Sequence, residues 1–358
     1  MSAKKILFFI QLAPPLHGAA LMNQRVLDVI AESDSFSAEV LRLNYAYDFQ
    51  SMHDATHKKI IYTLKIYLAF MYSLIFQRPN SVYIAFAPFG LGFYRDFMLA
   101  MISRAFGCEV KLHLHGTGLS STKTKIKSWL LSKLFQSCDL VLLSEALYPD
   151  VSRFVLADRV TYISNAVDTP TVNKRKLNEV VTFLYVANLD ERKGVLKAVE
   201  VFSEYFKSNE DSILNVVGAD TVAMTKKKLL EIIEDKYPHL NGKVRLLGAL
   251  YGKEKEEVYS SADIFIYPTE HDAAPLVVLE ALSYGLPVVC SNQGALSDMV
   301  IDGGNGFVVD EFNVASYVDS INGIRASYAK FSNSAKDIHL ERDSITALSK
   351  KIKDLFCD

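Results

Sequence analysis

Residues 263–291 read DIFIYPTEHDAAPLVVLEALSYGLPVVCS. The apolar run at residues 263–268 predicts a buried strand, and residues 287–291 predict a second one. Between them Pro275 opens an apolar helical segment that stops at Gly285, with proline expected at the first helical position and glycine just past the last. The stretch is therefore predicted to be one strand–helix–strand unit, the building block of a parallel sheet.

Two carboxylates bracket the start of this helix, Asp272 in the loop and Glu280 inside the helix. Open α/β sheets bind ligands at the carboxyl ends of their strands, where the N–H groups of a helix start attract anions. An acidic residue beside such a site favours hydroxyl groups over phosphate. A nucleotide-sugar has both a diphosphate and sugar hydroxyls, so it meets both demands. Pro275 has no backbone N–H, so the N–H groups available to phosphate or sugar are those of Ala274, Leu276 and Val277.

Strand-like runs alternate with helical patterns along the chain, which predicts parallel sheets. They form two series separated by a polar, basic stretch at 169–178, the predicted linker. A chain of 358 residues is also too long for one core. We therefore expect an α/β fold with Rossmann-like domains at 1–168 and 179–343 and a helical tail at about 344–358. The predicted strands are residues 6–10, 81–85, 110–115, 140–144, 181–187, 213–217, 243–247, 263–268 and 287–291.

The net charge of −2 conceals an asymmetry between the two halves. Residues 1–178 contain 20 Lys+Arg and 13 Asp+Glu, a balance of +7, and residues 179–358 contain 19 and 28, a balance of −9. The basic half favours contact with an anionic membrane or acceptor, with a solvated basic surface as the alternative. Nucleic acid is not expected, because no zinc pattern or aromatic-interleaved basic motif occurs. The four cysteines lack paired spacing and fit a reducing, cytoplasmic setting.

The most apolar stretch, IIYTLKIYLAFMYSLIF, covers residues 60–76. It predicts a helix with three alternatives: packing in the core, lying on a membrane surface, or crossing the membrane. The stretch is slightly short for a span and contains Lys65. On a helix, the apolar residues of this stretch would occupy more than one face, which packing against the core alone does not explain. A peripheral position at the inner face of the membrane is therefore one expectation.

The stretch 263–291 resembles the signature of glycosyltransferase family 4, in which two acidic residues are separated by seven others. The resemblance implies the GT-B fold, two Rossmann-like domains whose parallel sheets face each other across a cleft, with the last helix packing back on the first domain. It also implies a retaining glycosyltransferase that moves a sugar from a nucleotide-sugar donor to a saccharide or lipid-linked saccharide acceptor, in cell-surface polysaccharide biosynthesis. Further matching pieces are KKILFFIQLAPPLHG (4–18), HLHG (113–116), NAVD (165–168), YVANLDERKG (185–194) and GLPVVCSNQGALSDMVIDGGNGFVV (285–309).

The same resemblance implies roles for individual residues. His115 would lie beside the transferred sugar, and Lys193 would stabilise the departing diphosphate. Asp272 would reach a sugar hydroxyl, or else cap the helix, and Glu280 would bind the ribose hydroxyls. Gly18 would let the backbone approach the diphosphate or the acceptor, with a plain turn as the alternative.

The chain departs from the family pattern at two of these positions. Asn188 replaces an arginine and carries no charge, so Arg192 or Arg245 would have to substitute for it. Asp272 replaces a more common glutamate. No metal or cofactor is expected, because Lys193 and the helix dipoles would supply the positive charge. Two alternatives stay open. One is a nucleotide-sugar epimerase or sugar phosphorylase of similar fold, and the other, which the two departures motivate, is a non-catalytic sugar-binding subunit.

Overall fold

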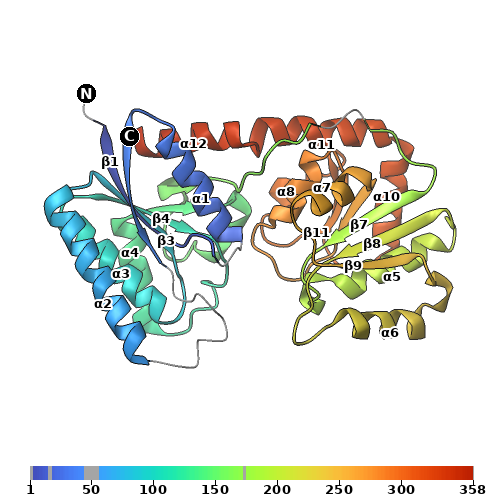
Figure 1. The fold of residues 1–358 in the computed structure, drawn as a ribbon, viewed down its shortest axis with the longest axis horizontal. Coiled ribbons are helices and arrows are strands. Elements are labelled where there is room, and N and C mark those ends of the chain that lie inside the picture. Colours follow the sequence, from blue (N-terminus) through green and yellow to red (C-terminus); the bar gives the residue numbers. More distant parts are fainter. Residues whose placement is uncertain (1–2, 15–17, 44–55, 172–174, 358) are drawn as a thin grey trace. The chain divides into compact units, whose positions relative to one another are not determined.

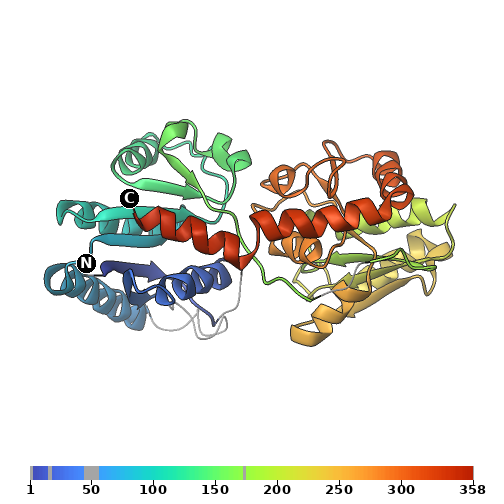
Figure 2. The same ribbon diagram turned by 90° about the horizontal axis from the view of Figure 1, so that it is seen from above.

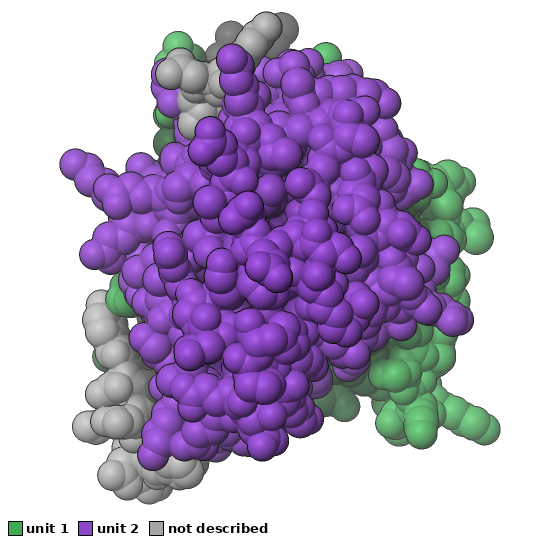
Figure 3. All heavy atoms as spheres, turned by 90° about the vertical axis from the view of Figure 1, so that its right-hand side faces the viewer, with its two compact units in different colours: residues 1–165, 348–358 green, residues 166–347 purple. Residues whose placement is uncertain are grey.

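The computed structural model describes residues 3–14, 18–43, 56–171 and 175–357, and for residues 56–63 it describes the backbone only. The chain divides into two compact units, coloured separately in Figure 3. The first unit comprises residues 1–165 and 348–358, and the second comprises residues 166–347. Within the described residues each unit contains a six-stranded parallel sheet. This confirms the predicted α/β fold class, with one parallel sheet in each half of the chain.

The sheet of the first unit has the strand order β2-β1-β3-β4-β5-β6. The sequence predicts β1, β3, β4 and β5 to within two residues at each end, whereas it does not predict β2 and β6. β6 has only three residues, and β2 is an edge strand without regular alternation of buried and exposed residues. The strands are β1 (Lys4–Ile10), β2 (Phe36–Arg42), β3 (Ser81–Phe86), β4 (Glu109–Leu114), β5 (Asp139–Leu142) and β6 (Val160–Tyr162).

Helices cover both faces of this sheet, with α2, α3 and α4 on one face and α1 and the end of α12 on the other (Figures 1 and 2). Strand β1 serves both layers because its side chains alternate. Leu7 and Phe9 join the core beneath α2–α4, whereas the ring of Phe8 lies 6.3 Å from that of Phe356 in α12. The helices are α1 (Gly18–Ala31), α2 (Thr56–Tyr72, continued by a π-helical turn, Ser73–Gln77), α3 (Gly90–Ala105), α4 (Lys125–Ser137) and α12 (Ile345–Cys357).

The most apolar stretch of the sequence, residues 60–76, lies in α2 and its π-helical turn, so the predicted helix is confirmed. Ile66, Phe70 and Leu74 are buried in the core beside the sheet, while apolar side chains on the opposite side of the helix are exposed. Among the described residues, no helix is long and apolar enough to span a membrane.

The sheet of the second unit has the order β12-β11-β10-β7-β8-β9, so β7 and β10 are neighbours near its middle. All its strands are parallel, as expected for alternating strands and helices. Its strands are β7 (Val181–Val186), β8 (Ser212–Val217), β9 (Val244–Gly248), β10 (Ile264–Tyr267), β11 (Val288–Ser291) and β12 (Gly306–Val309). Its helices are α5 (Val195–Phe206), α6 (Lys226–Lys236), α7 (Gly252–Ser261), α8 (Leu276–Ser283), α9 (Leu296–Met299), α10 (Val314–Ala326) and α11 (Tyr328–Arg342).

The predicted helix that contains Glu280 is α8, with one correction at its start. Pro275 is the N-cap residue, with φ −71° and ψ 119°, so it precedes the first helical position instead of occupying it. Its extended backbone turns the chain from the loop into the helix. Gly285 follows the helix with φ +73°, a conformation that glycine adopts without strain.

The described part of the predicted linker is tied to the second unit. Arg175 donates hydrogen bonds to the backbone carbonyls of Tyr259, Ser260 and Ala262, at the end of α7. A cation there compensates the negative end of the helix dipole. Asn178 binds the buried carboxylate of Asp263 through its backbone and side-chain amides. These contacts fix the chain before it enters β7.

Candidate functional site

Two loops meet where β7 and β10 end side by side. One follows β7 and carries Lys193 in a short 3₁₀ turn (Glu191–Lys193), and the other follows β10 and carries Asp272. β7 and β10 are paired in parallel, so their carboxyl ends lie at the same edge of the sheet. This edge is the region where the sequence predicts a ligand site.

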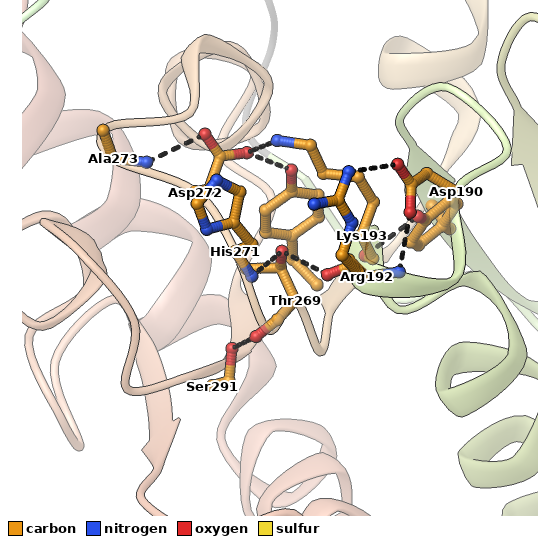
Figure 4. Close-up of polar contacts among 10 residues, drawn as sticks. Asp190, Arg192, Lys193, Thr269, His271, Asp272, Ala273 and Ser291 are labelled. Carbon is orange, nitrogen blue, oxygen red and sulfur yellow. Dashed lines mark hydrogen bonds and ion pairs between the residues drawn. The ribbon is translucent and has the colours of Figure 1, made fainter. Parts of the chain in front are cut away.

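Lys193 and Asp272, 79 positions apart in the sequence, form an ion pair (Figure 4). The Lys193 Nζ lies 2.6 Å from Asp272 Oδ2. The same oxygen accepts a hydrogen bond of 2.7 Å from the hydroxyl of Tyr267, and Oδ1 accepts one of 3.0 Å from the Ala273 N–H. Both charged side chains remain partly exposed, at 30% and 19%. The structure therefore brings together two of the predicted site residues at a position that a ligand can reach.

Close backbone contact fixes the positions of the two loops relative to each other. Gly194 has φ +84°, and a Cβ added there would lie 2.1 Å from the carbonyl oxygen of Pro268. The Glu270 N–H donates a hydrogen bond of 2.8 Å to the carbonyl of Arg192. The hydroxyl of Tyr185, from β7, donates to the carbonyl of Lys193 at 2.9 Å. Only glycine fits at position 194, and α5 begins directly after it, so Lys193 is held beside a helix N-terminus.

Glu280 lies in a separate set of contacts. Its Oε1 and Oε2 lie 2.8 Å and 2.7 Å from the Nζ of Lys255, and Oε2 accepts a hydrogen bond of 2.8 Å from the hydroxyl of Tyr259. Burial, together with the neighbouring Glu280, raises the pKa of Tyr259 well above its usual value, so its hydroxyl stays protonated and donates. Lys255 and Tyr259 come from α7 and were not predicted as site residues.

Tyrosines are the signal that could have revealed these contacts. Tyr185, Tyr259 and Tyr267 are at most 1% exposed. A buried tyrosine hydroxyl usually has a hydrogen-bond partner, so a tyrosine in an apolar segment points to a nearby polar group. Here each hydroxyl supports one of the predicted site residues or the backbone beside it.

The start of α8 and the loop before it contain the three residues whose N–H groups the sequence predicts to bind phosphate or sugar. Ala274 is buried, whereas Leu276 and Val277, in the first turn, are partly exposed. The first N–H groups of a helix have no acceptor within the helix. Their roles toward phosphate or sugar stay a prediction.

Neither Arg192 nor Arg245 takes the place of the arginine that the family pattern has at position 188. Asn188 is exposed in the loop after β7. The guanidinium of Arg192 is paired with Asp190 at 3.2 Å, and its side chain is 69% exposed. Arg245 is the second residue of β9, close to the amino end of the strand, whereas the site is at the carboxyl ends. Lys193 is therefore the cation best placed for a ligand at this edge.

The remaining predicted site residues belong to the first unit. His115 directly follows β4, and its ring centroid lies 4.1 Å from that of His113. His113 is hydrogen-bonded through Nδ1 to the hydroxyl of Tyr83. Burial, and next the proximity of His115, hold the pKa of His113 well below its usual value, so it is neutral at physiological pH. Gly18 is the first residue of α1, and residues 15–17 of its predicted loop lie outside the described residues.

The loop after His115 is held by two residues that the sequence analysis did not identify. The carboxylate of Asp150 accepts hydrogen bonds of 2.8–3.0 Å from the N–H groups of Gly118, Leu119 and Ser120. Arg153 donates to the carbonyls of Ser120 and Thr122. Three N–H groups around one carboxylate fix the backbone of this loop, which starts at His115.

The Lys255–Glu280 pair leads to a first prediction. Replacing Lys255 with methionine is expected to weaken the binding of a nucleoside diphosphate by about two- to fivefold, because a partly exposed ion pair orients the carboxylate at a modest gain of energy. Isothermal calorimetry with nucleoside diphosphates measures this change, and Lys253→Met on the same helix, whose side chain is exposed, is the matched control. Tighter binding in the Lys255 variant would show that this lysine competes with the ligand for Glu280.

Among the described residues, no group of three or more His, Cys, Asp or Glu side chains is arranged to hold a metal ion. The expectation that no metal or cofactor takes part stays a prediction.

Comparison with known proteins supports one class of enzyme. Residues 171–338, within the second unit, match the model of the family glycosyl transferases group 1. The chain is 26% identical over 222 residues to the UDP-Gal:alpha-D-GlcNAc-diphosphoundecaprenol alpha-1,3-galactosyltransferase of Escherichia coli, covering 56% of this chain and 54% of that protein. The chain spans between 15% and 54% of the length of the curated relatives reported for it.

Solved structures extend the similarity to the whole fold. The lipopolysaccharide outer core galactosyltransferase WaaB superposes with a TM-score of 0.73 at 16% identity, over 98% of each chain. Anabaena Alr3699/HepE, in complex with UDP, gives 0.72 at 15% identity over 99% of each chain. At such low identity these likenesses establish the fold alone, which is GT-B. The family model, the relatives and the fold together support a glycosyltransferase of the group 1 superfamily.

Proposed function

We propose that this chain is a retaining glycosyltransferase of family 4 that transfers a sugar from a nucleotide-sugar donor to a saccharide or lipid-linked saccharide acceptor. The observation that carries the proposal is the Lys193–Asp272 pair at the carboxyl ends of β7 and β10, beside the N-terminus of α5. A cation and a helix N-terminus suit the diphosphate of the donor, and the carboxylate suits its sugar hydroxyls.

The chemical step depends on charge. As the bond between sugar and diphosphate breaks, negative charge builds on the leaving nucleoside diphosphate. The ammonium of Lys193 and the N–H groups at the start of α5 stabilise that charge without a metal. Asp272 holds the lysine in place before the donor binds, and Tyr267 and the Ala273 N–H hold Asp272.

Two relatives support the choice of substrates. The Escherichia coli relative is named for UDP-galactose and for an acceptor linked to diphosphoundecaprenol, and the Anabaena protein was solved with UDP. We infer a UDP-sugar donor as the first to test, and a lipid-linked acceptor used in cell-surface polysaccharide synthesis at the inner face of the membrane.

The direct test is a thermal-shift panel of UDP-, GDP- and ADP-sugars, since a ligand that binds the folded state raises its stability by mass action. Release of the nucleoside diphosphate with an acceptor present would identify transfer. Release of sugar phosphate on adding free phosphate would indicate a phosphorylase, and formation of an epimer without an acceptor an epimerase. Binding without any turnover would indicate a non-catalytic sugar-binding subunit.

A second prediction concerns Glu280. Its replacement by glutamine is expected to weaken UDP binding by about 1–3 kcal/mol, because hydrogen bonds from the ribose hydroxyls to a charged acceptor are lost. The fold should survive the nearly isosteric change. Calorimetry with UDP measures the loss, and Glu257→Gln, exposed on α7, is the control. An unchanged affinity in the Glu280 variant would remove this residue from the donor site.

A further inference from the structure

An exposed apolar surface covers the outer side of α2, α3 and α4 in the first unit. Of the twenty large hydrophobic side chains that are exposed among the described residues, twelve lie between Leu64 and Trp129. Seven of the twenty lie in the described part of the second unit. Soluble proteins rarely leave so many large apolar side chains together on one surface without a binding role.

The exposed side chains form stripes along the helices. On α2 and its π-helical turn they recur every three or four residues, which is the spacing of one helical face. The opposite sides of the same helices are buried in the core, so the stripes point away from the sheet. The exposed residues are Leu64 (58%), Leu68 (62%), Tyr72 (55%), Ile75 (44%) and Phe76 (67%) on α2 and its turn, Leu91 (87%), Tyr94 (52%) and Met98 (47%) on α3, and Ile126 (69%) and Trp129 (61%) on α4.

The three helices lie side by side in one layer on a single face of the sheet (Figures 1 and 2). Their stripes are therefore on the same side of the first unit. We name the exposed residues of these three helices the α2–α4 face. Apolar side chains of adjacent helices in one layer can enter a flat apolar phase together, which a single stripe cannot do as effectively.

The charge on this layer has one sign. The sequences of α2, α3 and α4 contain a single acidic residue, Asp96, whose side chain is buried and paired with Arg95. Two of the basic side chains lie against aromatic rings of this surface. The Nζ of Lys127 is 4.6 Å from the ring centroid of Phe89, and that of Lys133 is 5.3 Å from the ring of Trp129. The other basic residues of the layer are Lys58, Lys59, Lys65, Arg104 and Lys125.

This combination favours a lipid surface over a protein partner. The core of a protein interface is depleted in lysine, whereas lysines that extend over apolar side chains suit the boundary between headgroups and acyl chains. Tryptophan and tyrosine are enriched at the same depth of a bilayer, and Tyr72, Tyr94 and Trp129 are exposed on the face. The absence of acidic residues from the outer side of these helices, as their sequences show, complements anionic headgroups.

We propose that the α2–α4 face docks onto a bilayer containing anionic lipid, with its aromatic residues at headgroup depth. The docking deepens the proposed function, because a lipid-linked acceptor lies in such a bilayer. It does not depend on donor chemistry, so it can succeed or fail independently of the sugar-transfer proposal.

The test uses the full chain and vesicles of phosphatidylcholine, with and without phosphatidylglycerol. We expect co-sedimentation that rises with anionic lipid and falls with salt. Trp129 is the only tryptophan of the chain and lies on the face, so its emission should shift to shorter wavelength and be quenched by bromine-labelled lipid. UDP binding to the same preparation, measured by calorimetry, reports on the donor site separately.

Two variants separate charge from apolar insertion. Replacing Lys125 and Lys127 of α4, together with Lys123, which is exposed two residues before the helix, by glutamine should weaken the partition coefficient roughly 100-fold. This corresponds to about fivefold for each basic residue near the surface. Leu68→Ser with Phe76→Ser should weaken it on the order of tenfold and reduce the quenching, since both side chains are exposed in the free protein. The matched control replaces the three exposed lysines at the start of α6, Lys226, Lys227 and Lys228, with glutamine.

Several outcomes would overturn the docking proposal. The first is wild-type protein that stays in the supernatant with anionic vesicles at low salt. The second is binding without quenching of Trp129, and the third is an equal loss of binding in the α6 control. Association of the protein with itself through the α2–α4 face, abolished by the Leu68 and Phe76 changes and not by lipid, would assign the face to a protein interface instead.

Discussion

Replacing Lys193 with alanine is expected to lower kcat by a factor on the order of 10²–10³, while the KM for the donor rises much less. The reason is that negative charge on the diphosphate grows between the ground state and the transition state, so the ammonium contributes most where the bond is breaking. Steady-state release of nucleoside diphosphate, measured with the donor found in the thermal-shift panel, gives both constants.

The fold should tolerate this change. The Lys193–Asp272 pair is partly exposed, and such pairs contribute about 1 kcal/mol or less to stability. Arg192→Ala is the matched control, because its guanidinium is directed to Asp190 and is mostly exposed. A Lys193 variant with kcat close to that of the wild type would place the counter-charge elsewhere. Equal losses in both variants would indicate that the loop as a whole, and not the ammonium of Lys193, determines the rate.

The sequence predicts those parts of the fold in which local pattern and burial agree. The central strands β1, β3, β4, β7, β8 and β10 are apolar and bounded by polar or glycine-containing turns, so each is visible as a short apolar run. β2 sits at a sheet edge, where only one side is paired, and its burial does not alternate. At the start of α8, the preference of proline for the first helical position was outweighed by the extended backbone that the loop requires at Pro275.

The predicted site was less accessible to sequence reasoning than the fold. The resemblance to the family signature selected Asp272 and Glu280 as a pair, yet in the structure each carboxylate has its own cation, Lys193 and Lys255. Such pairing depends on residues brought together from different loops and helices, which no local pattern encodes. The exposed apolar side chains of α2 form one surface with those of α3 and α4, and the sequence of α2 alone does not show which helices lie beside it.

Acidification is expected to destabilise the second unit through His339. This histidine of α11 is 1% exposed, and its Nε2 is 3.0 Å from the hydroxyl of Thr169. Burial lowers the pKa of His339 from 6.5 to about 4, although the nearby Asp168 acts in the opposite direction. Between these two values the unfolded chain binds a proton that the folded chain does not, so the free energy of unfolding falls as the pH falls.

The size of this effect follows from the two pKa values. A difference between 6.5 and about 4 corresponds to a loss of up to about 3 kcal/mol, since one pKa unit equals about 1.4 kcal/mol, and the loss is complete below pH 4. Urea unfolding followed by far-UV circular dichroism at pH 7, 6, 5 and 4.5 measures it, while the fluorescence of Trp129 follows the first unit alone.

In His339→Gln the part of the pH dependence that belongs to this histidine should disappear, whereas the contribution of His113, whose pKa is lowered in the same direction, should remain in the Trp129 signal. If the variant and the wild type lose stability in parallel between pH 6.5 and 4.5, His339 takes up its proton in the folded state at an ordinary pKa, and the prediction is wrong.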